Sequence, residues 1–164
     1  MKTIRNNVFE TNSSSTHTII IPKEYNINDS IEPRKLVAHI DEFGWEYKTH
    51  RDLLDYIYTG LVYIYGDDYK EYTKKIYEIL RPYNIEIEWV EPEKDDWGYS
   101  GYIDHGYELE DFYKDLFNDT SLLINAVING YVNTGNDNED NGEDYEYDCT
   151  RKNESNEYRY FKGN

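Results

Sequence analysis

Hydrophobic residues with strand spacing occur in three short runs. His17-Thr18-Ile19-Ile20-Ile21 is rich in β-branched residues and ends at a proline, and residues 36–40 form a second run. Residues 85–90, Ile-Glu-Ile-Glu-Trp-Val, alternate with period two, which is typical of a half-buried strand whose glutamates face water or a partner. The pattern predicts three strands, with a loop over residues 22–34 and a turn-like segment over residues 41–50.

Helical spacing dominates two stretches in the middle of the chain. Residues 50–61 place leucine, isoleucine and tyrosine three and four positions apart, with Thr49 as the expected N-cap and Gly60 as a weak point in the interior. Residues 67–80 repeat this spacing and stop before Pro82. Each stretch therefore predicts one helix.

Two further helices are predicted in the second half. Residues 108–118 carry one apolar stripe, and residues 120–129 are almost entirely apolar in their middle and are closed by Gly130. We expect the second of these helices to be buried. The chain then becomes polar and acidic, with room for a terminal hairpin in which residues 145–147 face residues 158–161.

Together these elements predict an α+β fold, in which a small antiparallel sheet packs with about four helices and an acidic C-terminal loop or hairpin follows. We expect an α+β domain over residues 1–134. Residues 135–164 are expected to form the acidic loop and terminal hairpin, packed on or extending the same domain. A chain of 164 residues is long enough to bury the core of one ordinary domain.

Charge narrows the functional classes. The chain has 34 acidic and 17 basic side chains and a formal net charge of -17, and residues 91–164 hold 19 of the acidic and 6 of the basic ones. A conventional nucleic-acid binder needs a basic surface to replace phosphate counterions, so this balance argues against direct nucleic-acid binding. It favours high solubility, cation binding or a basic protein partner.

Other sequence features point to a cytoplasmic protein. The N-terminal residues show no signal-peptide pattern, and no apolar run approaches the ~20 residues that span a bilayer. Cys149 is the single cysteine, which excludes an intramolecular disulfide and a cysteine-rich zinc site. No cofactor is expected.

The most acidic stretch covers residues 135–148 and holds seven carboxylates in fourteen positions. Asp137, Glu139 and Asn141 match EF-hand ligand positions, but Asp148 replaces the bidentate glutamate and no helix pattern follows. A solvated acidic loop is the simpler interpretation. A third interpretation is that carboxylates spaced along a surface imitate the phosphates of a nucleic-acid backbone and compete for a basic groove.

The polar run ETNSSSTH, residues 10–17, permits two interpretations. One is a polar turn with local side-chain caps that leads into a strand. The other is a phosphate-binding loop made by Ser13, Ser14, Ser15 and His17, although the run has no glycine-rich pattern and no lysine.

Histidines beside carboxylates offer a further possible site. Glu10, His17, Asp104 and His105 could surround a divalent metal or a phosphate, but no pair among them has helical ligand spacing. A packed aromatic cluster that includes Trp45 competes with this interpretation, and no metal site is predicted.

Three stretches together resemble a known group of proteins. VFETNSSSTH at residues 8–17, EFGWE at 42–46 and GYIDH at 101–105 are similar to small proteins encoded by phages and mobile elements of Gram-positive bacteria. The resemblance covers roughly residues 5–110 and implies a viral or mobile-element setting, with no catalytic residues to carry over. In that setting, the acidity resembles that of antirestriction and anti-CRISPR proteins.

The leading hypothesis is a phage-encoded inhibitor of a bacterial defence nuclease, which binds a basic nucleic-acid groove of that enzyme through an acidic, tyrosine-bearing surface. The alternative is a phosphate-, nucleotide- or metal-binding enzyme that uses the ETNSSSTH loop with His105. The residues expected to bind the partner are Asp137, Glu139, Asp140, Glu143, Asp144, Tyr145, Glu146, Tyr147 and Asp148, extended by Glu86 and Glu88.

Overall fold

The computed structural model describes residues 15–44, 46–96, 98–104, 109–136 and 157–162, and it confirms the α+β fold. Four α-helices and ten strands lie in these ranges, together with two short 3-10 helices. The elements in chain order are β1 (Ser15–Pro22), β2 (Arg34–Ala38), β3 (Glu42–Phe43), β4 (Lys48–His50), α1 (Leu53–Tyr65), η1 (Gly66–Asp68), α2 (Tyr69–Leu80), η2 (Arg81–Tyr83), β5 (Ile85–Trp89), β6 (Lys94–Asp95), β7 (Gly98–Tyr99), β8 (Tyr102–Ile103), α3 (Glu110–Asn118), α4 (Thr120–Asn129), β9 (Tyr131–Asn136) and β10 (Glu157–Lys162).

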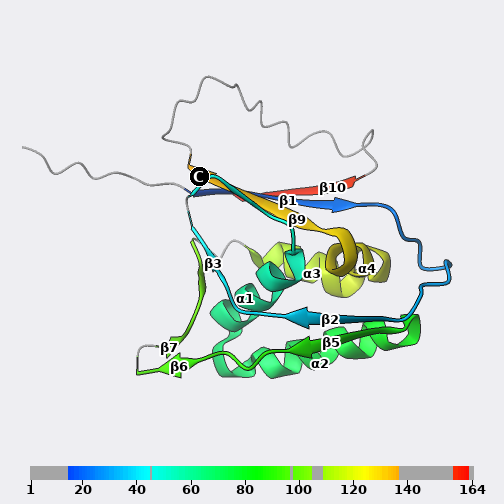
Figure 1. Ribbon diagram of the computed structural model, residues 1–164, viewed down its shortest axis with the longest axis horizontal. Coiled ribbons are helices and arrows are strands. Elements are labelled where there is room, and N and C mark those ends of the chain that lie inside the picture. The colour runs from blue at the N-terminus through cyan, green and yellow to red at the C-terminus, as the bar shows by residue number, and fades with distance from the viewer. Residues whose placement is uncertain (1–14, 45, 97, 105–108, 137–156, 163–164) are drawn as a thin grey trace, which may run out of the picture.

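The main sheet has four antiparallel strands in the order β10-β1-β9-β4. Figure 1 shows this sheet along one side of α1, α3 and α4. Ile19 and Ile21 of β1 and Val132 of β9 are buried and belong to the hydrophobic core. The predicted antiparallel sheet is therefore present, and its two inner strands, β1 and β9, are far apart in the sequence.

Smaller two-stranded sheets complete the fold. β2 pairs with β5 and β3 pairs with β8, both in parallel, while β6 and β7 form a short antiparallel ribbon. Figure 1 shows β2 and β5 on the part of the molecule opposite the main sheet, close to α1 and α2. In this view α1, α3 and α4 lie between the main sheet and the β2–β5 pair, whereas α2 lies beside β5.

Strong local periodicity gave correct predictions. The alternating run predicted as a strand forms β5, with Glu86 and Glu88 exposed. The apolar helix forms α4 with the predicted bounds, and its residues 122–127 are all buried.

Two predictions in the first half were wrong. The segment over residues 41–50 is not simply a turn, because β3 and β4 lie within it. Thr49 does not cap the following helix: it belongs to β4, and α1 begins at Leu53, where the side chain of Asp52 accepts a hydrogen bond from the backbone N–H of Leu54 at 3.1 Å. An aspartate close to the first helical turn competes well with threonine for this role.

The polar C-terminal region contains more of the fold than its composition indicates. Residues 131–136, interpreted as the start of an acidic tail, form the strand β9, which crosses the expected boundary between residues 134 and 135. Val132 and Thr134 of β9 are buried. The expected terminal strand over residues 158–161 lies within β10, whose observed partner is β1, whereas residues 145–147 lie outside the described part.

Gly60 lies in the interior of α1, where a glycine normally weakens a helix. Its position is explained by the ring of Tyr113 from α3, since a Cβ on Gly60 would overlap the Tyr113 hydroxyl and crowd the Cδ1 atom of Ile103. Tyr113 is buried and its hydroxyl donates a hydrogen bond to the backbone carbonyl of Ile57 at 2.9 Å. The missing side chain therefore allows α3 to pack against α1.

Gly60→Ala is expected to destabilise the protein by about 1–3 kcal/mol through overpacking, although alanine alone favours a helix by about 1 kcal/mol over glycine. Tyr113→Phe removes the overlapping hydroxyl, so the double variant Gly60→Ala/Tyr113→Phe should lose less stability than the sum of the single variants. Urea denaturation of the four proteins measures this coupling. Additive losses would contradict the assigned contact.

Candidate functional site

Parts of the three stretches that carry the sequence resemblance meet at one end of the main sheet. β3 and β8 pair so that Glu42 lies opposite Tyr102 and Phe43 lies opposite Ile103. The ring of His17 on β1 donates a hydrogen bond from Nε2 to the backbone carbonyl of Gly44 at 2.9 Å. Residues far apart in the sequence therefore form one local structure.

His17 holds this end of the sheet together. Its side chain is fully buried, and Nδ1 lies 2.9 Å from the hydroxyl of Tyr56 on α1. A carbonyl only accepts hydrogen bonds, so Nε2 carries a proton, and a second hydrogen bond joins Nδ1 to the Tyr56 hydroxyl. Both ring nitrogens are used inside the protein, which gives His17 a structural role.

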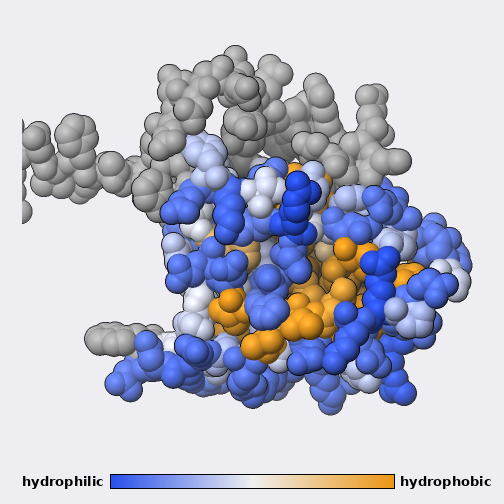
Figure 2. Space-filling model, viewed as in Figure 1, coloured by the Kyte–Doolittle hydropathy of each residue, from blue (hydrophilic) through white to orange (hydrophobic). Residues whose placement is uncertain are grey.

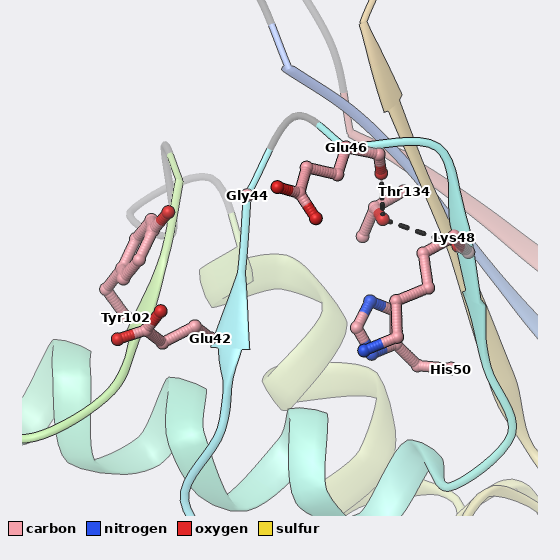
Figure 3. Close-up of a pocket in the computed structure, with 7 residues that line it drawn as sticks. All are labelled: Glu42, Gly44, Glu46, Lys48, His50, Tyr102 and Thr134. Atoms are coloured by element: carbon pink, nitrogen blue, oxygen red, sulfur yellow. Dashed lines mark hydrogen bonds between the residues drawn. The ribbon is translucent and has the colours of Figure 1, made fainter.

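A cleft of about 110 Å³ opens beside Gly44. Figure 3 shows Lys48 and His50 extending from β4 toward β3, whereas the side chain of Glu42 lies on the opposite side of β3, next to Tyr102. The hydroxyl of Thr134 on β9 donates to the backbone carbonyl of Glu46 at 2.6 Å and so holds Glu46 against β9. The residues that line the cleft are Glu42, Gly44, Glu46, Lys48, His50, Tyr102 and Thr134.

The two walls of the cleft differ in charge. Burial and the positive charge of Lys48 lower the pKa of His50, whose ring packs against Phe43 with 4.6 Å between the centroids. On the other wall, burial and then the negative charges of Glu42, Asp104 and Glu46 raise the pKa of Tyr102. His50 is therefore neutral at pH 7, and the acidic wall is suited to a cationic group.

Of the residues predicted for phosphate binding, the structure describes Ser15 and His17. Ser15 and His17 are buried, and Ser13, Ser14, Glu10 and His105 lie outside the described residues. The interpretation of ETNSSSTH as a phosphate loop therefore stays a prediction for Ser13 and Ser14, whereas the ring of His17 is turned into the protein.

The predicted partner-binding residues are placed only in part. Glu86 and Glu88 are exposed on β5, where the carboxylate of Glu88 pairs with the ammonium of Lys35 on β2 at 2.9 Å. The ion pair offsets one of the two charges on this face. The nine predicted residues between positions 137 and 148 lie outside the described residues.

Sequence reasoning missed the cleft, because its residues are brought together by the pairing of β3 with β8 and of β4 with β9, which are distant in the sequence. Glu42, Glu46 and Lys48 fall in the segment predicted as turn-like, His50 stands where a helix is predicted to begin, and Tyr102 lies outside every predicted helix and strand. The one signal available was the joint occurrence of EFGWE and GYIDH, which the β3–β8 pairing now brings together.

Comparison with protein-family models, curated proteins and solved structures finds no match to this chain. Within the residues that the structure describes, no group of three or more histidine, cysteine, aspartate or glutamate side chains is arranged to hold a metal ion. Over the same residues, no helix has both the length and the apolar character needed to cross a membrane.

His17→Leu is expected to destabilise the protein by about 2–4 kcal/mol, because it leaves the Tyr56 hydroxyl and the Gly44 carbonyl without these partners. Thr18→Val on the same strand, at a half-buried position, is the matched control and should change stability by less than about 1 kcal/mol. Thermal and urea denaturation measure both variants. A similar loss in the two variants would show that the histidine hydrogen bonds contribute little.

His50 predicts a loss of stability in acid. Because the pKa of His50 is lowered in the folded state, the unfolded chain binds a proton more readily than the folded protein does. The contribution of neutral His50 to the free energy of unfolding is therefore present above about pH 6.5 and is lost as the pH falls toward the pKa of the folded state. Stability curves of the wild type and Lys48→Gln should therefore diverge below about pH 6.5, with the variant losing less, because Lys48 no longer opposes protonation. Parallel curves would contradict this assignment.

Proposed function

We propose that this chain is a binding protein of a phage or mobile element that inhibits a bacterial defence nuclease in the host cytoplasm by occupying its basic nucleic-acid groove. The observation that carries the proposal is the excess of exposed acidic side chains among residues 91–136, where the described part exposes eight carboxylates and two lysines. These side chains are Glu91, Glu93, Asp95, Asp96, Glu110, Asp111, Asp115, Asp119, Lys94 and Lys114.

Strand geometry supports a surface that imitates a phosphate backbone. Glu86 and Glu88 lie two residues apart on β5 and point to the same face, which places their Cα atoms about 7 Å apart. A phosphate backbone also presents regularly spaced negative charges to the basic groove that binds it. Carboxylates in such a row attract the groove over long distances and favour rapid association.

The cleft provides a place for one cationic side chain of the partner. Tyr102 is 41% exposed and stands beside Glu42 in the β3–β8 pairing. An arginine of the nuclease can stack on an aromatic face while its guanidinium pairs with a carboxylate, an arrangement that combines two favourable contacts. The cleft therefore supplies an anchor, and the surrounding acidic surface supplies attraction.

The enzyme hypothesis has less support. A site built from the ETNSSSTH loop would need His17 to face a ligand, but both of its ring nitrogens are hydrogen-bonded to Tyr56 and Gly44 inside the protein. Ser15 is also buried. The binding function is the better conclusion from this geometry.

The proposal is tested by competition between this chain and DNA for a purified CRISPR nuclease or restriction enzyme. The wild type should displace DNA, and its affinity should fall about tenfold or more between ~0.05 M and ~0.5 M NaCl, because salt screens the attraction between opposite charges. Replacing Glu93, Asp96, Glu110 and Asp111, four of these exposed carboxylates, with the corresponding amides should weaken inhibition about tenfold or more.

A control variant removes the same number of charges elsewhere, by amide substitution of Glu32, Asp68, Glu71 and Glu78, all of which are exposed. It should inhibit nearly as well as the wild type. Equal weakening in both variants would mean that net charge alone is responsible, and unchanged inhibition in the first variant would overturn the assigned surface.

A further inference from the structure

The edge of β2 that faces away from β5 carries unpaired backbone groups. Arg34 donates its N–H to the carbonyl of Asn84 at 2.9 Å, and the carbonyl of Ala38 accepts from the N–H of Val90 at 3.0 Å. In a parallel pair, alternate residues point toward the partner strand, so Lys35 and Val37 direct their N–H and C=O groups to the opposite side. Among the residues that the structure covers, none pairs with these four groups.

The open edge is short and has defined ends. Pro33 precedes it and has no N–H to donate, and the N–H of His39 is bound by the carboxylate of Asp55 at 2.7 Å. Val37 is 38% exposed, and Figure 2 shows hydrophobic side chains gathered along the part of this face that β2 crosses in Figure 1. Two residues with free backbone groups therefore border an exposed hydrophobic surface, which is the setting in which another strand is added to a sheet.

We propose that this edge pairs with the same edge of a second copy of the chain, with the two β2 strands antiparallel about a twofold axis at Leu36. In this register Lys35 of each copy lies opposite Val37 of the other. Because Lys35 and Val37 are two residues apart, both resulting pairs are hydrogen-bonded pairs, and Leu36 meets Leu36 of the second copy in the non-hydrogen-bonded position between them. All four free groups of each copy are then satisfied, and the two β2–β5 sheets become one four-stranded sheet.

Charge explains why a second copy fits β2. Two molecules of net charge -17 repel each other, so they can associate only through a surface without excess negative charge. Residues 33–40 contain Arg34 and Lys35 and no carboxylate, and the ammonium of Lys35 also offsets the carboxylate of Glu88 on β5. The proposed register also places no like charges directly opposite each other, because Lys35 faces a valine.

The opposite edge of the same sheet shows the contrast. Ile85, Ile87 and Trp89 of β5 point their backbone groups away from β2 by the same alternation. A symmetric antiparallel pair about Ile87 would set Glu86 of each copy opposite Glu88 of the other and bring four carboxylates together. Like charges directly opposite each other are destabilising, so β5 is protected against this pairing and β2 is not.

Sedimentation equilibrium of the full chain tests the proposal. The wild type should form dimers at concentrations up to ~1 mM, and the dissociation constant should fall as NaCl is raised from ~0.05 M to ~0.5 M, because salt screens the repulsion between the copies. Nuclease binding through the acidic surface has the opposite dependence on salt, so the two proposals fail independently.

Two variants address the edge. Val37→Pro removes an N–H that is free in the monomer and used in the dimer, and Lys35→Glu introduces a carboxylate into the pairing; each should weaken dimerisation about tenfold or more. Lys74→Glu makes the same charge change on the exposed face of α2 and should leave the dissociation constant within about threefold. Circular dichroism verifies that each variant is folded. If the proline variant unfolds, the test rests on Lys35→Glu, which keeps the backbone N–H. The proposal would be overturned if the wild type stayed monomeric at the highest concentration and salt, which would leave the edge free for a strand of another protein. It would also be overturned if the edge variants were folded and dimerised as the wild type does.

Discussion

The structure depends on the burial of α1 around its whole circumference. Leu53, Leu54 and every residue from Tyr56 to Val62 are buried, so the helix has no side left for water over most of its length. A helix of this kind must be covered by other elements in every direction. β9 and β8, α2 and α4, and β2 all contact it, and the layers of the fold are arranged around this requirement.

Polar groups on so buried a helix need partners inside the protein, and each partner fixes a neighbouring segment. The hydroxyl of Tyr58 donates to the carbonyl of Val90 after β5, and the hydroxyl of Thr59 accepts from the N–H of Asp41 before β3. Tyr56 reaches β1 through His17, which in turn holds Gly44 beside the cleft. The geometry of the cleft is thus a consequence of how the polar atoms of α1 are satisfied.

Sequence reasoning succeeded where the signal was local. The alternation of Ile85, Ile87 and Trp89 with glutamates identified β5, and the apolar run before Gly130 identified α4. It failed where pairing between distant segments decides the structure. Residues 131–136 contain threonine, glycine and asparagine and therefore look polar. They form an inner strand because both neighbouring strands pair with them and one face is buried, neither of which requires every residue to be hydrophobic. β3 and β8 are two residues long and have no periodicity to detect, so the cleft that their pairing helps to form could not be predicted.

The order of strands in the main sheet has a consequence for folding. β1 lies between β9 and β10, and its residue pairs join positions more than 100 residues apart. Such pairs close long loops before they gain any contact energy, so a fold built on them has a high contact order and forms slowly. During synthesis, β1 leaves the ribosome long before β9 and β10. Until they follow, its isoleucine-rich segment has no partner strand at either edge. The interval between making β1 and making β9 is therefore when the nascent chain is most prone to aggregation and most dependent on chaperones.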